Sequence, residues 1–121
     1  MGKTIMIVED EYPFHELYTA MLEDTDYEII HVYDGEEALS KLEQEKPDLI
    51  ILDILLDMMT GDTFFLYLKG MPEYADIPVI VISNSPKRDY KSLRVVEPNL
   101  IFLAKTVTKE KLIEKINARI G

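Results

Sequence analysis

A carboxylate at the end of an apolar run is the first feature of this sequence that could do chemistry. Residues 49–52 read Leu-Ile-Ile-Leu, and Asp53 follows them directly. A short continuous apolar run is typical of a strand that is buried on both faces of a sheet. In open α/β sheets ligands bind outside the carboxyl ends of the strands, so a carboxylate at this point is placed for chemistry. From this stretch alone, an aspartate that merely begins a loop explains the pattern equally well.

Three other apolar runs also end in polar residues. Residues 4–8 are followed by Glu9 and Asp10, residues 77–82 by Ser83, and residues 100–104 by Lys105. If all these runs are parallel strands, their carboxyl ends lie along one edge of a sheet. The sequence therefore predicts that these four side chains and Asp53 share one site.

The combination of residue types predicts a phosphoryl-transfer site. The carboxylates of Glu9, Asp10 and Asp53 would repel one another unless a cation or protons joined them, and oxygen ligands of this kind suit Mg²⁺. The ammonium of Lys105 and the hydroxyl of Ser83 can stabilise the oxygens of a phosphoryl group. Asp53 is the predicted nucleophile, because carboxylates can form aspartyl phosphates.

Helical patterns separate the predicted strands. A further strand is expected over residues 28–32. The first helix runs from Pro13 to near Asp24, and its inward stripe is predicted to consist of Phe14, Leu17, Tyr18, Met21 and Leu22. The second helix is predicted to be capped by Asp34 together with Glu37, and the last one by Thr108. A third helix carries Phe64, Phe65, Leu68 and Met71 and is expected to stop at Gly70 and Pro72. The fourth, over residues 87–97, is weakly amphipathic, and Val96 is expected to point inward. This fivefold alternation predicts an α/β fold, a doubly wound parallel sheet with helices on both faces.

The two histidines do not form a recognisable site in the sequence. His31 has no partner at the spacing of metal ligands, so we interpret it as a strand histidine. His15 is expected on the surface of the first helix. No functional role is predicted for either residue.

Composition excludes several classes of function. A chain of 121 residues without cysteine forms one domain, 1–121, and uses no disulfide or thiolate metal site. Its 23 acidic and 13 basic residues give a net charge of −10, which disfavours nucleic acid and anionic lipid as direct partners. No apolar run approaches the roughly 20 residues of a membrane span, and no signal peptide is recognised. We expect a soluble cytoplasmic protein.

Taken together, the residues at the strand ends resemble the receiver domains of bacterial two-component response regulators. The acidic pair Glu9-Asp10, the phosphoacceptor Asp53, the switch hydroxyl Ser83 and the lysine Lys105 stand in the register of that family. The likeness runs over essentially the whole chain. It implies a flavodoxin-like fold with five helices and the strand order 2-1-3-4-5.

The resemblance also implies a mechanism. Mg²⁺ would be held by Glu9, Asp10, Asp53 and the backbone carbonyl of Leu55, and a histidine kinase or phosphotransfer protein would supply the phosphoryl group. Ser83 and Phe102 match the switch positions, and Gly61 matches the glycine that closes the loop after the phosphoacceptor. A downstream protein target would read the face made by the fourth helix, fifth strand and fifth helix. The chain would be a monomer or a weak homodimer through that face. It would be a phosphoacceptor that assists its own phosphorylation and dephosphorylation, not an enzyme.

Three positions depart from the family pattern. Asp57 stands where proline is usual and adds an acid near the site, and Asn84 replaces a smaller residue beside the phosphate. Thr106 replaces the proline that usually follows the lysine. A cis bond without proline costs about 3 to 4 kcal/mol, so we expect a trans bond between Lys105 and Thr106.

Other functions remain open at this point. A receiver excised from a larger regulator or kinase has the same sequence features, and a pseudo-receiver could act as an interaction module without phosphorylation. A phosphatase of the haloacid dehalogenase type would need a second aspartate two residues after the nucleophile, where this chain has Leu55. A flavodoxin-like cofactor carrier would need a phosphate-binding loop after the first strand, where residues 9–11 are acidic.

Overall fold

The computed structural model of this chain describes residues 2–54, 56, 60–84 and 91–121. Strands and helices alternate along these residues. The strands are β1 (Thr4–Val8), β2 (Glu28–Val32), β3 (Leu49–Asp53), β4 (Val79–Ser83) and β5 (Ile101–Ala104). The helices are α1 (Tyr12–Leu22), α2 (Gly35–Gln44), α3 (Gly61–Gly70), α4 (Lys91–Val96) and α5 (Lys109–Ile120). The predictions that concern Leu55, Asp57 and residues 85–90 lie outside the described residues.

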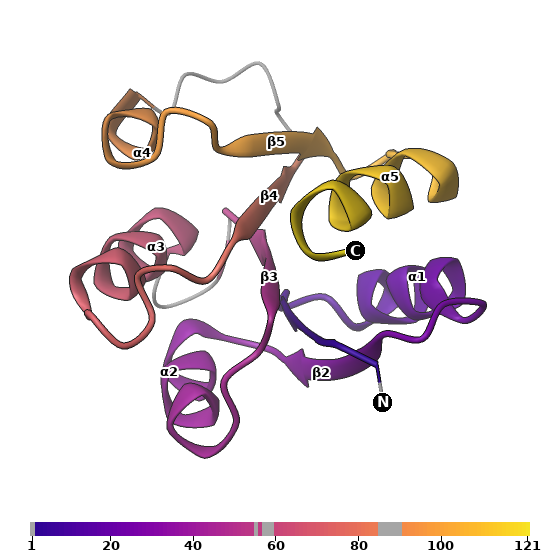
Figure 1. Cartoon of the computed structure of the whole chain (residues 1–121), viewed down its shortest axis with the longest axis horizontal. Coiled ribbons are helices and arrows are strands. Elements are labelled where there is room, and N and C mark those ends of the chain that lie inside the picture. The colour runs from indigo at the N-terminus through magenta and orange to yellow at the C-terminus, as the bar shows by residue number, and fades with distance from the viewer. Residues whose placement is uncertain (1, 55, 57–59, 85–90) are drawn as a thin grey trace.

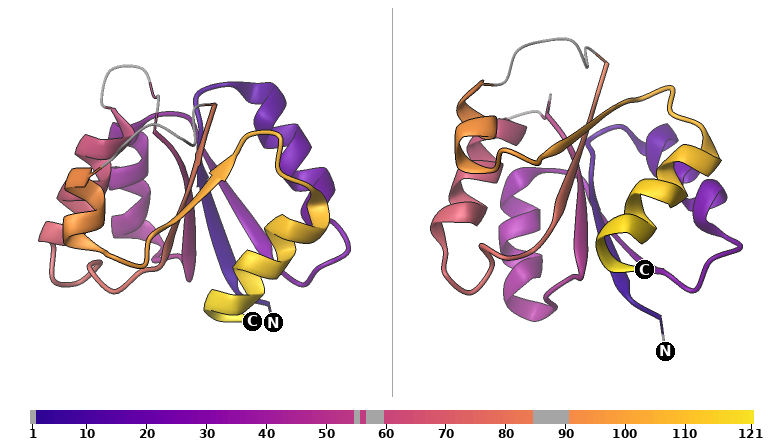
Figure 2. Two further views of the ribbon diagram at one scale, coloured as in Figure 1. Left: turned by 90° about the horizontal axis from the view of Figure 1, so that it is seen from above. Right: turned by 45° about the horizontal axis from the view of Figure 1, so that its top comes forward.

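The strands form one parallel sheet in the order β2-β1-β3-β4-β5. Helices α1 and α5 cover one face, and α2, α3 and α4 cover the other (Figure 1). The views in Figure 2 show the sheet between these two helical layers. The predicted doubly wound fold and its strand order are confirmed. All five strands therefore present their carboxyl ends at one edge of the sheet.

Two apolar clusters, one on each face of the sheet, hold the layers together. Neighbouring residues of a strand point to opposite faces, so Met6 and Val8 join the cluster under α2, α3 and α4, while Ile5 and Ile7 join the cluster under α1 and α5. Both faces of the sheet are thus removed from water. This is why the central strands have apolar side chains at successive positions.

Side-chain caps begin two of the helices as the sequence predicts. Asp34 accepts a hydrogen bond from the backbone N–H of Glu37 at 2.7 Å, and Thr108 accepts one from the N–H of Lys111 at 3.2 Å. Each cap satisfies a backbone donor that the first helical turn leaves unpaired. In the parts of the chain that the structure describes, no helix has the length and apolar character to cross a membrane.

The inward face of α1 differs from the prediction. His15, Tyr18 and Leu22 are buried at spacings of three and four, whereas Leu17 is 40% exposed. Tyr18 and Leu22 point inward as predicted, whereas Leu17 does not, and the prediction that His15 lies on the helix surface is wrong. The reason is that His15 has a polar partner at each ring nitrogen inside the fold, which a hydropathy pattern does not reveal.

Smaller differences concern β4, β5 and α4. β4 begins at Val79, two residues later than predicted, after Pro78, which has no N–H for the ladder. β5 begins at Ile101, one residue later than predicted. Val96, expected to point inward, is 46% exposed at the end of a six-residue helix whose Leu93 is fully buried.

Candidate functional site

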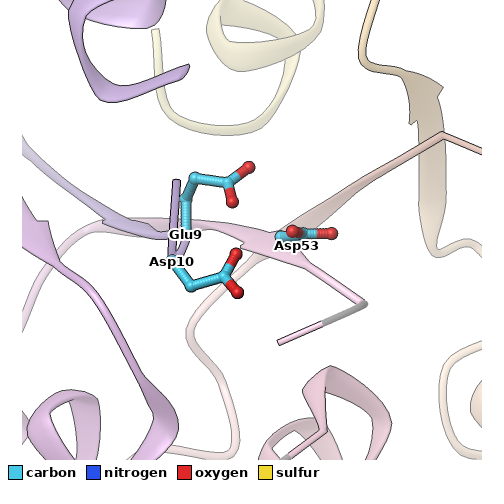
Figure 3. Close-up of side chains that lie close together, drawn as sticks. All are labelled: Glu9, Asp10 and Asp53. Carbon is cyan, nitrogen blue, oxygen red and sulfur yellow. The ribbon is translucent and has the colours of Figure 1, made fainter. Parts of the chain in front are cut away.

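Three carboxylates lie together at the carboxyl ends of β1 and β3 (Figure 3). Asp53 is the last residue of β3, and Glu9 and Asp10 follow the neighbouring β1. One carboxylate oxygen from each side chain lies within 4.8 Å of the others. Glu9 and Asp53 are buried, and Asp10 is partly exposed. This arrangement gathers three acidic groups where the fold opens to solvent.

Lys105, which directly follows β5, reaches into this group. Its Nζ lies 2.7 Å from Glu9 Oε1, 3.0 Å from Asp53 Oδ2 and 3.9 Å from the exposed Glu11. The ring of Phe14 lies 4.1 Å from the same nitrogen, a cation–π distance. Burial lowers the pKa of Lys105, but hydrogen bonds and charges from Glu9 and Asp53 outweigh that effect and raise it. The ammonium therefore stays charged inside the site.

The carboxylate of Glu9 is held from two sides. Its Oε2 accepts the backbone N–H of Glu11 at 3.1 Å, and its Oε1 forms the ion pair with Lys105. Burial, opposed by Lys105 and by the N–H of Glu11 and reinforced by the charge of Asp53, raises the pKa of Glu9 to about 8. The cost of burying this carboxylate therefore favours its protonated form unless a cation is bound beside it.

The donor set fits a hard divalent cation. Three carboxylates against one ammonium leave two formal negative charges, and Glu9 Oε1 is buried without a well-aligned hydrogen bond although Lys105 Nζ is 2.7 Å away. All three groups offer oxygen, which is the ligand type that Mg²⁺ takes. A cation beside Glu9 and Asp53 would offset the cost of burying the Glu9 carboxylate, as well as the smaller repulsion from Asp53.

Gly61 is the position where the loop after β3 returns against the site. Its N–H donates to the carbonyl of Ile54 at 2.9 Å. A Cβ on Gly61 would lie 2.4 Å from the carbonyl oxygen of Asp53 and 2.5 Å from the Cα of Ile54. These neighbours are backbone atoms that cannot move aside, so only glycine allows the close approach.

The two predicted switch residues lie on β4 and β5. Ser83 is buried, one position beyond Ile82, which pairs with Asp53, and its carbonyl accepts the N–H of Lys105 at 3.1 Å. Phe102 is half-buried in the middle of β5, and the guanidinium of Arg94 from α4 lies 4.4 Å above its ring. Ser83 is thus at the same sheet edge as the carboxylates, whereas Phe102 lies toward α4. Asn84 and Thr106, two of the departures noted above, are exposed.

Sequence reasoning missed three residues that contact the site. Glu11 supplies an N–H to Glu9, Phe14 covers Lys105, and His15 donates from Nε2 to the backbone carbonyl of Glu9 at 2.6 Å. All three follow the acidic pair within one and a half helical turns. Their place directly after a strand that ends in candidate site residues is the signal that could have found them.

Comparison with known sequences shows the family of this chain. A family model described as the response regulator receiver domain matches residues 5–117. The polar-differentiation response regulator DivK of Brucella anthropi is 32% identical over 122 residues, which cover all of this chain and 98% of that protein. The response regulator GtcR of Aneurinibacillus migulanus is also 32% identical, over 99% of this chain. The chain spans only 48% of the length of GtcR.

Solved structures share the fold. The signal receiver domain of a signal transduction histidine kinase from Syntrophus aciditrophicus is 32% identical, with a TM-score of 0.85 over 98% of this chain and 90% of that one. The receiver domain of the sensor histidine kinase PA1611 from Pseudomonas aeruginosa is 24% identical, with a TM-score of 0.87 over 100% and 99% of the two chains. That receiver was crystallised with a magnesium ion coordinated in its active site cleft.

Proposed function

This chain belongs to the family of response regulator receiver domains, and from this premise we propose that it accepts a phosphoryl group on Asp53 and changes a partner-binding surface in response. The observation that carries the proposal is the contact of Lys105 Nζ with Asp53 Oδ2 at 3.0 Å, inside a group of carboxylates that outnumber it. A nucleophilic carboxylate, a fixed ammonium and an acidic group suited to a divalent cation are the parts that phosphoryl transfer to aspartate needs.

Phosphorylation follows from this geometry as a single displacement. An oxygen of Asp53 attacks the phosphorus of a phosphohistidine on a histidine kinase or phosphotransfer protein. The O–P bond forms as the P–N bond breaks, and the electron pair of that bond returns to the imidazole of the donor. Lys105, already 3.0 Å from the attacking carboxylate, stabilises the negative charge on the phosphoryl oxygens.

Glu9, Asp10 and Asp53 are the side chains that would hold Mg²⁺. The family resemblance adds the backbone carbonyl of Leu55. The bound ion supplies further neutralisation of phosphoryl charge. The magnesium ion in the similar receiver of PA1611 supports this assignment.

Phosphorylation of Asp53 shifts the protein between two conformations, which differ in how the side chains pack at the carboxyl ends of β4 and β5 and on the neighbouring face. Ser83 moves its hydroxyl toward the phosphoryl group, and Phe102 turns into the space that is vacated. Phe102 contacts Arg94 of α4, so its movement changes the face formed by α4, β5 and α5, which a downstream protein reads. The chain acts in the cytoplasm as a phosphoacceptor that assists its own transfer, as a monomer or as a weak homodimer through this face.

Intact-mass measurement after incubation with acetyl phosphate and Mg²⁺ tests the proposal. We expect a gain of one hydroxylamine-sensitive phosphoryl group, and beryllofluoride binding to the same carboxylate. Asp53→Asn removes the nucleophile while keeping the side-chain volume, so both signals disappear. Asp76→Asn, at an exposed aspartate before β4, is the matched control and retains them.

Two outcomes would overturn this proposal. Retention of the phosphoryl group in Asp53→Asn would place the acceptor elsewhere. Failure of the unchanged chain to gain mass or to bind beryllofluoride or Mg²⁺ would favour an interaction module that works without phosphorylation.

A further inference from the structure

His15 of α1 and His31 of β2 face one another across the helix–sheet boundary. Their Nδ1 atoms lie 2.8 Å apart, with ring centroids 4.9 Å apart and ring planes at 62°. His15 is 1% exposed, whereas His31 is an exposed residue. Two imidazoles sixteen residues apart in the sequence thus direct one nitrogen each at a common point.

In each ring, the hydrogen bond made by Nε2 determines whether Nδ1 carries a proton or a lone pair. Nε2 of His15 lies 2.6 Å from the carbonyl oxygen of Glu9, which can only accept, so Nε2 carries the proton. In the neutral ring, Nδ1 of His15 is therefore a lone pair aimed at His31. Nε2 of His31 lies 3.4 Å from the hydroxyl of Thr19, which can either donate or accept.

The pair lies at the wall of an open surface pocket between α1 and β2. The pocket is lined by His15, Thr19, His31 and Tyr33 together with the carboxylates Glu16 and Glu23. Burial and the neighbouring His15 lower the pKa of His31, so its ring is neutral at physiological pH. Two imidazoles beside an open pocket lined by carboxylates are the surroundings that a cation with nitrogen ligands needs.

We propose that His15 and His31 form a binding site for a divalent transition-metal ion of the zinc and copper class, bound between their Nδ1 atoms. Metal–nitrogen bonds of about 2.0–2.1 Å at angles of about 90–110° separate two ligand nitrogens by about 2.9–3.4 Å. The present Nδ1···Nδ1 separation of 2.8 Å is thus close to the ligand spacing, and binding requires each ring to rotate so that its Nδ1 lone pair points at the ion instead of at the other ring. In the described residues no third histidine or carboxylate joins the pair at ligand distance, so water from the pocket completes the coordination.

The metal ion takes the place of the proton that lies between the two Nδ1 atoms. In the metal-free protein, His31 Nδ1–H donates to His15 Nδ1. On binding, that proton moves through solvent to Nε2 of His31, which then donates to Thr19, and both Nδ1 lone pairs become ligands. The carbonyl of Glu9 already orients the other ring as a backbone acceptor commonly does for a metal-bound histidine.

This site uses none of the carboxylates of the phosphoryl-acceptor site, which it adjoins through the backbone carbonyl of Glu9, and it does not rest on the function proposed above. Mg²⁺ takes oxygen ligands, whereas imidazole suits zinc, copper and nickel. The chain has two histidines and no cysteine, so a nitrogen signature from imidazole can come only from this pair.

Copper titration of the untagged chain, followed by electron paramagnetic resonance and spin-echo modulation, tests the proposal. We expect one Cu²⁺ with two imidazole ligands, which Zn²⁺ displaces, in addition to any Cu²⁺ that the carboxylates of the acceptor site bind without imidazole. His31→Gln is expected to weaken Cu²⁺ binding at least tenfold and to abolish the two-imidazole signature. Because the side chain of His31 is exposed, this variant is expected to fold, which circular dichroism checks.

Two matched variants separate this site from its neighbours. Thr19→Ala keeps both nitrogen ligands but removes the acceptor of His31 Nε2–H, so it is expected to keep the two-imidazole signature and to weaken Cu²⁺ binding less than His31→Gln does. Asp10→Asn removes a carboxylate of the acceptor site and is expected to leave the imidazole signature intact. Equal Cu²⁺ affinity in His31→Gln and the unchanged chain, or a spectrum with fewer than two imidazoles, would overturn the proposal.

Discussion

Lys69 and Lys105 both have buried side chains that lie over aromatic rings, yet their surroundings differ. Nζ of Lys69 donates to the carbonyls of Ala75 and Ile77 at 3.0 and 2.8 Å and pairs with one carboxylate, Glu97, at 3.3 Å. These three partners use the three protons of the ammonium, and the pair is neutral. Lys105 instead shares its charge among three carboxylates within 3.9 Å.

The difference shows how a structural ion pair can be told from a reactive one. The pair of Lys69 joins the end of α3 to the end of α4 and leaves no charge to neutralise. The group around Lys105 retains excess negative charge, has a raised pKa at Glu9 and opens to solvent through Asp10. A buried group with excess charge favours binding of an oppositely charged ligand, whereas a neutral ion pair only stabilises the packing of the elements that it joins.

The largest expected effect is on the rate of phosphoryl transfer. Lys105→Met removes a fixed cation from the developing charge, and we expect the rate with acetyl phosphate to fall about 10²–10³-fold. Lys69→Met, the matched control, should leave that rate within about twofold once the folded fraction is taken into account. Equal rates in the two variants would show that charge balance does not distinguish the two lysines.

A smaller effect is expected on the free energy of unfolding, and here Lys69→Met is expected to have the larger effect of the two variants. Lys69→Met leaves the carboxylate of Glu97 and two carbonyls without their donor, so we expect a loss of roughly 2–4 kcal/mol in the free energy of unfolding. Urea unfolding with and without Mg²⁺ measures it. Mg²⁺ should not restore this loss, but it should restore stability lost in Lys105→Met, since a cation can replace the ammonium only in the acceptor site. If Mg²⁺ restored the free energy of unfolding of Lys69→Met, the proposed difference between the two lysines would be wrong.

The smallest expected effect is a dependence of stability on pH that comes from Glu9. Its pKa in the folded chain, about 8, lies above the ordinary value of 4.5, so folding binds a proton. The corresponding stability is complete below pH 4.5 and is lost as pH rises through 8. Glu9→Gln stays neutral throughout. In the presence of a chelator, the stability of the variant relative to the unchanged chain should therefore rise steadily between pH 5 and 8.5.

The exposed Glu16→Gln is the control for this measurement and should show no such rise. A constant difference between Glu9→Gln and the unchanged chain across this range would show that Glu9 ionises normally. Urea midpoints at each pH decide between the two results.

Much of the site could be predicted because its residues stand at strand ends. A buried parallel strand is a short apolar run, and the residue that ends the run falls at a known edge of the sheet. Asp53 and Lys105, 52 residues apart, therefore reach one place without any knowledge of their contacts. The roles of Ser83 and Phe102 as switch residues remain predictions.

The part that could not be predicted lies on the helices. On α1 the error concerns Leu17 and His15, which are two residues apart and therefore point about 160° apart around the helix. The pattern of apolar residues favoured Leu17. The structure buries His15 instead, because hydrogen bonds to Glu9 and His31 satisfy its ring.

The sequence by itself determined the alternation of strands and helices, the parallel sheet and the residue types at its carboxyl edge, because these depend on local periodicity. Only the tertiary structure decided which charges meet, that Lys105 pairs with Glu9 as well as Asp53, and that two unremarkable histidines face one another. Such contacts depend on how each helix is rotated against the sheet. That rotation is set by packing and hydrogen bonding over the whole fold, and no short stretch of sequence contains it.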